Sequence, residues 1–123
     1  MKTSERYPVT QGNVIVNTAS TLFDRTVITA PILPADVYCG DILDSKTFAL
    51  FDSAAADAGN PIINLSNMSA SGAPKTLVIV DRHVVITDFA LRAKDAASKK
   101  AALEALTASG DIRLAVNADY FKV

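Results

Sequence analysis

The chain has 123 residues, of which half are apolar and a fifth are charged, and its formal net charge at pH 7 is −1. This length predicts one domain with a core large enough to fold without metals or disulfides. The mean hydropathy is +0.24, but no apolar run reaches the roughly 18 residues of a membrane span, and the absence of a basic block argues against nucleic-acid binding. We therefore expect the surplus apolar surface to lie in a subunit interface or docking face.

Runs of β-branched residues bounded by turn residues predict a series of short strands. In chain order they are 13–18, 25–29, 37–43, 47–51, 62–65, 75–80, 83–88 and 111–116. The sequence Asp44-Ser45-Lys46 predicts a turn between two of them. Asp81-Arg82 predicts a hairpin between 75–80 and 83–88, although it lacks the glycine that two-residue hairpin turns favour. A second helical turn at 53–58 would be ended by the Gly-Asn-Pro sequence that follows it.

One main helix is predicted near residues 95–108. Asp95 is the candidate N-cap, because its carboxylate can accept hydrogen bonds from the free amides of the first turn. Leu103 and Leu106 form an apolar side at helical spacing. Lys99 falls on that side, so we expect its stem to lie along apolar surface while its ammonium reaches water. Gly110 suits the left-handed residue that ends a helix.

The residues that most often carry chemistry are few in this chain. Cys39 is the only cysteine, which excludes an internal disulfide and fits a reducing cytoplasm. It is expected to act as a small buried apolar residue. His83 is the only histidine, and no second imidazole or cysteine accompanies it as a metal ligand, so we expect a surface or structural role. A Cys39/His83 nucleophile pair stays open at this stage.

The aspartates are expected to support turns at the ends of strands through hydrogen bonds to nearby backbone amides. The scattered glycines form no phosphate-binding loop, and no calcium-loop spacing is present. The first residues, MKTSERYPVT, lack the apolar core of a signal peptide. We therefore predict no enzymatic activity, no cofactor and no metal site. The aspartates in question are Asp36, Asp41, Asp44, Asp52, Asp57, Asp81 and Asp88.

The order of several segments resembles a known family. The segments are Pro31-Ile32-Leu33 with DSKTFALFD at 44–52, AAADAG at 54–59 leading into IINL at 62–65, TLVIV at 76–80 followed by a turn and VVI at 84–86, and ASKKAAL at 97–103 followed by Gly110 and Ile112. In this order they resemble the head decoration (capsid-stabilising) proteins of lambda-like tailed bacteriophages. The chain departs from the family at Arg82-His83, where Ser-Gly is common, and before the helix, where Trp-Pro is common. Residues 1–30 match the family poorly.

The resemblance implies a β-rich α+β domain (β-tulip-like) over residues 21–123 and an extended N-terminal arm over residues 1–20. It implies homotrimers on the outer surface of the expanded head, at three-fold and quasi-three-fold sites, with the major capsid protein as partner and the virion as location. The arm would pair with capsid strands by strand addition. Deleting the arm would then leave a folded domain. The implied capsid-contact residues are Tyr7, Pro8, Val9, Val14, Ile15 and Val16.

Three alternatives stay open. Residues 13–18 form an ordinary strand of the domain if they are not part of an arm. The chain is another phage structural β-domain, such as a tail-tube or head-completion protein, if it assembles as rings of six. It is an enzyme or ligand-binding module if a pocket forms around Cys39, His83 or the aspartates.

Overall fold

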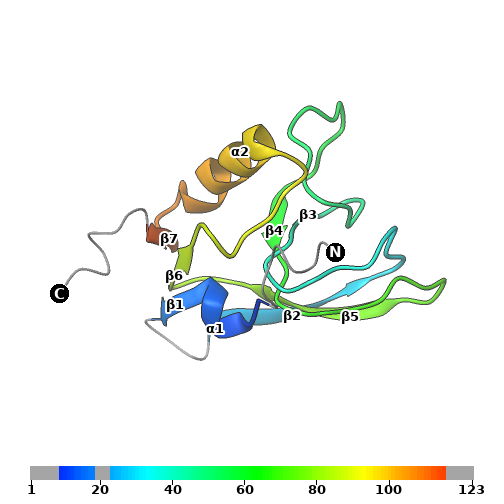
Figure 1. Cartoon of the computed structure of the whole chain (residues 1–123), viewed down its shortest axis with the longest axis horizontal. Coiled ribbons are helices and arrows are strands. Elements are labelled where there is room, and N and C mark those ends of the chain that lie inside the picture. Colours follow the sequence, from blue (N-terminus) through cyan, green and yellow to red (C-terminus); the bar gives the residue numbers. More distant parts are fainter. Residues whose placement is uncertain (1–8, 19–22, 116–123) are drawn as a thin grey trace.

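The computed structural model describes residues 9–18 and 23–115 (Figure 1). Short strands arranged in small sheets and one substantial helix make the fold α+β, as predicted. The elements are α1 (Gln11–Val14), β1 (Ile15–Thr18), β2 (Arg25–Ala30), β3 (Ile42–Asp44), β4 (Pro61–Ile63), β5 (Lys75–Val80), β6 (Val84–Thr87), α2 (Ala96–Thr107) and β7 (Ile112–Ala115).

The strands form three small sheets. In the first, β6 lies between β1, to which it is antiparallel, and β7, to which it is parallel. In the second, β2 and β5 form an antiparallel ribbon that runs along one side of the molecule (Figure 1). In the third, β3 pairs with β4. An isolated bridge between Asn64 and Ile79 connects the region after β4 to β5.

Two clusters of buried apolar residues hold these sheets together. The larger one gathers Val14 of α1 and Ile86 and Ile112 of the first sheet with Ile42 and Ile63 of the third. The smaller one lies on the other face of β5, around Leu77 and Ile79. Strand β5 is therefore covered on both faces, since Val80 belongs to the larger cluster and the partly buried Val78 packs against it. The run 77–80 is therefore apolar toward both faces as predicted, but β5 belongs to a two-stranded sheet and is not the central strand that we expected.

Helix α2 forms as the sequence predicts. The Asp95 carboxylate accepts a hydrogen bond from the Ser98 amide at 2.7 Å, and Gly110 has a φ of 86° after the helix. Leu103 and Leu106 are partly buried and pack against the larger core cluster. The helix packs against β7 and β4. The Lys99 ammonium also forms an ion pair with the Asp88 carboxylate at 2.8 Å, a contact that the sequence did not predict.

The predicted hairpin between β5 and β6 is wrong, because the two strands belong to different sheets. The amides of Asp81 and Arg82 donate to carbonyl oxygens of Asp24 and Phe23, which extends the pairing of β5 with the β2 side. His83 then adopts a φ of 63°, and its amide donates to the Asp111 carbonyl at 2.6 Å. The chain therefore passes from one sheet to another at His83, without the glycine that a tight hairpin turn needs.

The region 37–51 contains less strand than predicted. Only Ile42–Asp44 is regular, and the predicted strand 47–51 is reduced to a bridge between Leu43 and Leu50, with Phe48 at a φ of 62°. The Asp44 carboxylate explains the difference, because it accepts hydrogen bonds from the Lys46 amide at 2.7 Å and the Gly59 amide at 2.8 Å. These bonds confirm the turn after β3. They also occupy backbone amides that would otherwise be available for strand pairing.

The segment 53–58 forms turns rather than the predicted helical turn. The Asp52 carboxylate accepts a hydrogen bond from the Ala54 amide at 3.0 Å, and the Ser53 amide donates to the Ser98 hydroxyl oxygen at 2.9 Å. Side chains therefore satisfy the amides that would begin a helix.

Residues 11–18 belong to the folded domain. Val14 is completely buried and Ile15 is 8% exposed, and both lie in the larger core cluster. Strand β1 pairs with β6, with Ile15 opposite Ile86 and Thr18 opposite Val84. The ordinary-strand alternative therefore describes β1, and the expected boundary at residue 20 falls after it. The expectation that residues 1–20 can be deleted without loss of core is corrected by these contacts.

Candidate functional site

The predicted capsid-contact residues have different places in the structure. Tyr7 and Pro8 lie outside the described residues. Val9 is partly buried against the larger core cluster, and Val14 and Ile15 are core residues. Val16 lies within β1. These residues therefore do not form one exposed contact surface in the described part of the chain.

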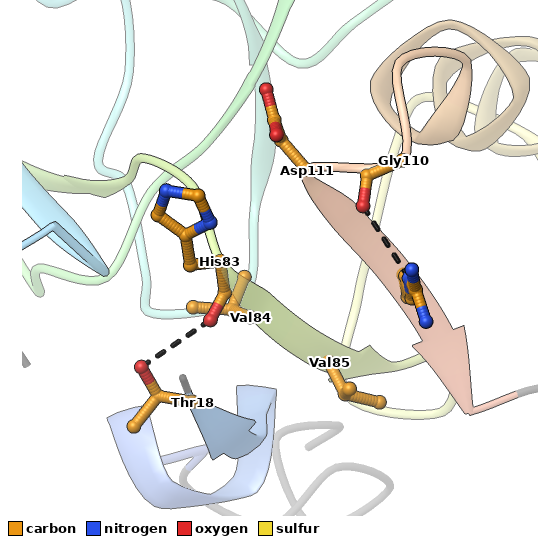
Figure 2. Close-up of a pocket in the computed structure, with 7 residues that line it drawn as sticks. Thr18, His83, Val84, Val85, Gly110 and Asp111 are labelled. Atoms are coloured by element: carbon orange, nitrogen blue, oxygen red, sulfur yellow. Dashed lines mark hydrogen bonds between the residues drawn. The ribbon is translucent and has the colours of Figure 1, made fainter. Parts of the chain in front are cut away.

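One pocket forms where the ends of β1, β6 and β7 meet, and it has a volume of about 370 Å³. Figure 2 shows Thr18 and Val84 on one side and Gly110 and Asp111 on the other. The Thr18 hydroxyl donates to the His83 carbonyl oxygen at 3.4 Å, and the Arg113 Nε donates to the Gly110 carbonyl oxygen at 3.4 Å. The complete lining is Thr18, His83, Val84, Val85, Gly110, Asp111 and Arg113.

The side chains beside this pocket form an aromatic and cationic cluster. The His83 ring meets the Phe23 ring edge-on, with centroids 6.2 Å apart and planes at 70°. The Arg82 guanidinium lies 4.7 Å from the Phe23 ring centroid, within the range of a cation–π interaction. Sequence reasoning missed this cluster, because it depends on the pairing of 81–82 with 23–24 in place of a hairpin.

The pocket does not have the geometry of a nucleophile and base. A proton relay needs the imidazole to join a hydroxyl to a carboxylate through its two nitrogens. Here the His83 ring contacts Phe23, and the Thr18 hydroxyl bonds the His83 backbone. Cys39 is 2% exposed in the core, whereas His83 is exposed. The Cys39/His83 pair therefore has a buried sulfur and a surface ring.

Most of the candidate aspartates make structural contacts. Asp41 is 1% exposed and is bound by the Arg92 guanidinium, which lies 5.8 Å from the Tyr38 ring centroid. The hydrogen bond to Asp41 raises the pKa of Arg92 above its ordinary value. Asp52 forms an exposed pair with Lys94 at 3.0 Å, and this bond lowers the pKa of Asp52. In the described ranges, no group of three or more potential metal ligands comes together.

A second hollow lies beside α2 and has a volume of about 490 Å³. Leu103 and Leu114 supply apolar surface, and the ion-paired Lys99 and Asp88 are also part of its lining. This hollow, like the first, is lined by side chains of both charge signs. The charges therefore do not select one kind of ionic ligand.

Large apolar side chains on the surface are the most distinctive feature of the described residues. They are distributed along the chain from the start of β2 to the loop after β6. A small domain that is stable alone in water usually keeps such side chains isolated or covers them with a partner. The exposed fractions are 42% for Phe23, 61% for Val27, 62% for Ile32, 50% for Tyr38 and 76% for Phe89.

Comparisons with known proteins found no similar protein. No protein-family model, no curated protein and no solved structure matches it. Among the described residues, no helix is long and apolar enough to cross a membrane.

Proposed function

We propose that the chain is a capsid decoration (cement) protein of a tailed bacteriophage. It binds as a homotrimer to the outside of the expanded head, with the major capsid protein as its partner, and it has no enzymatic role. The ordered resemblance over residues 31–116 supports this proposal. The exposed apolar side chains support it from the structure, because a protein that spends its working life between neighbours on a shell has partners to cover them.

The observation that carries the proposal is the exposure of Phe23, Ile32 and Tyr38 in one small domain. A trimer seated on a three-fold site buries apolar surface between its copies and against the shell. Closed symmetry is the usual outcome for identical subunits, and a three-fold site matches a three-fold partner. The β-tulip-like architecture implied by the resemblance is part of the same proposal.

Attachment to the shell is proposed to use strand addition near the N-terminus. Strand β1 is at the edge of its sheet in the order β1-β6-β7, so one of its edges has no strand beside it in the described part of the chain. Residues 1–8 precede this edge and include Tyr7 and Pro8. Three such segments on one trimer bind as a set, which raises the overall affinity above that of one segment.

Binding to the expanded shell alone stabilises that shell. A ligand that binds one state and not the other shifts the equilibrium toward the bound state. Strand addition requires an exposed partner strand at the correct spacing, and the resemblance implies that expansion completes these sites. The many copies on one head make the total effect large even when each copy contributes a modest free energy.

The test mixes the purified protein with unexpanded and expanded heads of its phage. We expect trimers at three-fold positions of expanded heads in images of the particles, and a higher temperature of genome release at full occupancy. Equal binding to both forms, or an unchanged release temperature at full occupancy, would contradict the proposal. Six-membered rings in solution or on particles would favour a tail-tube protein instead.

A further inference from the structure

The second edge of strand β2 is open. Among the described residues β2 pairs with β5 alone, in an unbroken register from Arg25 opposite Val80 to Ala30 opposite Lys75. In residues 9–18 and 23–115, no strand lies beside the backbone amides and carbonyls of β2 that point away from β5. Thr26, Val27 and Thr29 are exposed along this strand, and Val27 is 61% exposed.

This edge lacks the features that usually prevent pairing with another chain. Protein edges are commonly protected by lysine, proline, a bulge or a very short strand. Strand β2 has six residues, RTVITA, whose only charge is Arg25 at its first position, and its register with β5 contains no bulge. Its β-branched residues favour an extended conformation. The edge is therefore suited to accept another strand.

We propose that β2 pairs with β2 of a second copy of this chain, antiparallel and centred on Val27. The charge pattern selects this arrangement. Parallel self-pairing would place the two Arg25 side chains beside each other, and like charges directly opposite are unfavourable. Antiparallel pairing about Val27 places Arg25 opposite Thr29 and Thr26 opposite Ile28. The two exposed Val27 side chains then face each other.

The result is a continuous four-stranded sheet, β5-β2-β2-β5, across a two-fold axis. The pairing covers a short strand and buries little area, so the association is weak and depends on concentration. It does not rest on the proposed capsid function. If the proposed trimer forms, β2 pairing links trimers to one another, and its loss leaves the trimer itself intact.

The first experiment compares wild type, Val27→Lys and a control by sedimentation equilibrium from about 10 µM to about 1 mM, the range of weak association. Phe89→Lys is the control, because it also replaces an exposed apolar side chain with lysine, but on the loop after β6. We expect the mass of wild type and Phe89→Lys to rise toward twice the starting species. Val27→Lys places two ammonium groups opposite each other across the two-fold axis. Their repulsion should abolish the increase in mass with concentration. A thermal melt checks that each variant is folded.

The second experiment uses a disulfide to test the register. Cys39 is 2% exposed, so Val27→Cys adds the one accessible thiol among the described residues. Directly opposite residues have Cβ atoms about 4.5–5.5 Å apart, close to the spacing that a disulfide bridges. We expect Val27→Cys to form covalent dimers on mild oxidation much faster than Phe89→Cys.

Three results would overturn the proposal. The first is a wild-type mass that does not increase over the whole concentration range. The second is an equal loss of association in both lysine variants. The third is a Val27→Cys protein that crosslinks to the major capsid protein on particles and never to itself, because this result assigns the β2 edge to a different partner.

Discussion

Asp41 and Arg92 form a bidentate ion pair that ties β3 to the segment before α2. The Arg92 Nε donates to Oδ1 and a terminal guanidinium nitrogen donates to Oδ2, both at 2.9 Å. Their backbones are also joined, because the Ile42 amide donates to the Arg92 carbonyl at 2.7 Å and the Arg92 amide donates to the Gly40 carbonyl at 2.9 Å. The Tyr38 amide adds a third bond to the same carboxylate at 2.9 Å.

Arg92→Met should lower the free energy of unfolding by about 2–3 kcal/mol. The substitution leaves the Asp41 carboxylate buried with only the Tyr38 amide among its present hydrogen-bond donors. Removing one partner of a fully buried pair costs about 3–5 kcal/mol, and the cost here is smaller because the Arg92 side chain is 42% exposed. Urea denaturation measures the change.

Lys94→Met is the matched control for this pair. This substitution removes the ion pair between Lys94 and Asp52. Their side chains are 61% and 27% exposed, respectively. Solvent screens such pairs, so we expect little change in stability. If Arg92→Met and Lys94→Met lower the free energy of unfolding equally, the burial of Asp41 is not the reason that its ion pair stabilises the protein.

Gly110→Ala should cost about 1 kcal/mol through backbone conformation alone. Gly110 has a φ of 86°, which an alanine adopts only with strain, yet no atom lies within 4 Å of an added Cβ. Gly72→Ala is the control, because its Cβ also meets nothing within 4 Å and its φ lies outside that range. We expect Gly72→Ala to be neutral or slightly stabilising. Thermal unfolding of both variants checks the difference, and equal shifts would contradict it.

The sequence predicted the elements whose signals are local. The cap at Asp95, the left-handed Gly110 and the double-sided apolar run 77–80 each depend on residues close together in the chain, and each is present. The hairpin at Asp81-Arg82 failed for the opposite reason, since backbone bonds to Phe23 and Asp24 redirect the chain there. No local pattern contains those bonds.

The same distinction applies to the candidate sites. Arg92 lies far from Asp41 in sequence, and Phe23 lies far from Arg82, so neither contact has a spacing that could reveal it. The apolar patch Val14-Ile15-Val16 was compatible with an arm or with a strand of the domain. Burial of Val14 in the core distinguishes them, and burial is a property of the whole fold.

Asp95 should contribute an acid-sensitive part of the stability. Its hydrogen bond from the Ser98 amide lowers the pKa of Asp95 below the ordinary 3.8. A carboxyl with a lowered folded-state pKa stabilises the protein above its unfolded pKa, and the contribution is lost as the pH falls through the folded value. At pH 7 we expect the unfolding temperature to decrease from wild type to Asp95→Asn to Asp95→Ala, because asparagine can still cap the helix but has no charge.

Measuring unfolding temperatures from neutral pH to about pH 2 tests this assignment. The difference between wild type and Asp95→Asn should close as the pH falls below about 4. The other carboxyl groups are present in both proteins, so their titration largely cancels in the comparison. A difference that stays constant down to the lowest pH would mean that the charge of Asp95 is not the cause.

Two truncations should separate attachment from folding. Removing residues 1–8 keeps Val9, α1 and β1, so we expect an unfolding temperature close to that of the whole chain. Removing residues 1–20 deletes Val14 and Ile15 from the core, and it deletes the Gln11 side chain that accepts a 2.8 Å hydrogen bond from Arg25. It also exposes the edge of β6. We expect this shorter protein to be unfolded or severely destabilised.

Val14→Ala provides a graded version of the same test. It removes two methyl groups from a completely buried position and should cost roughly 2 kcal/mol. If residues 1–8 form the proposed attachment segment, the protein lacking them stays folded but loses occupancy on expanded heads, whereas Val14→Ala binds normally below its unfolding temperature. A folded 21–123 fragment would contradict the role of β1 in the core. Full occupancy by the protein lacking residues 1–8 would instead place the attachment surface on the domain, where the exposed apolar side chains are the next to test.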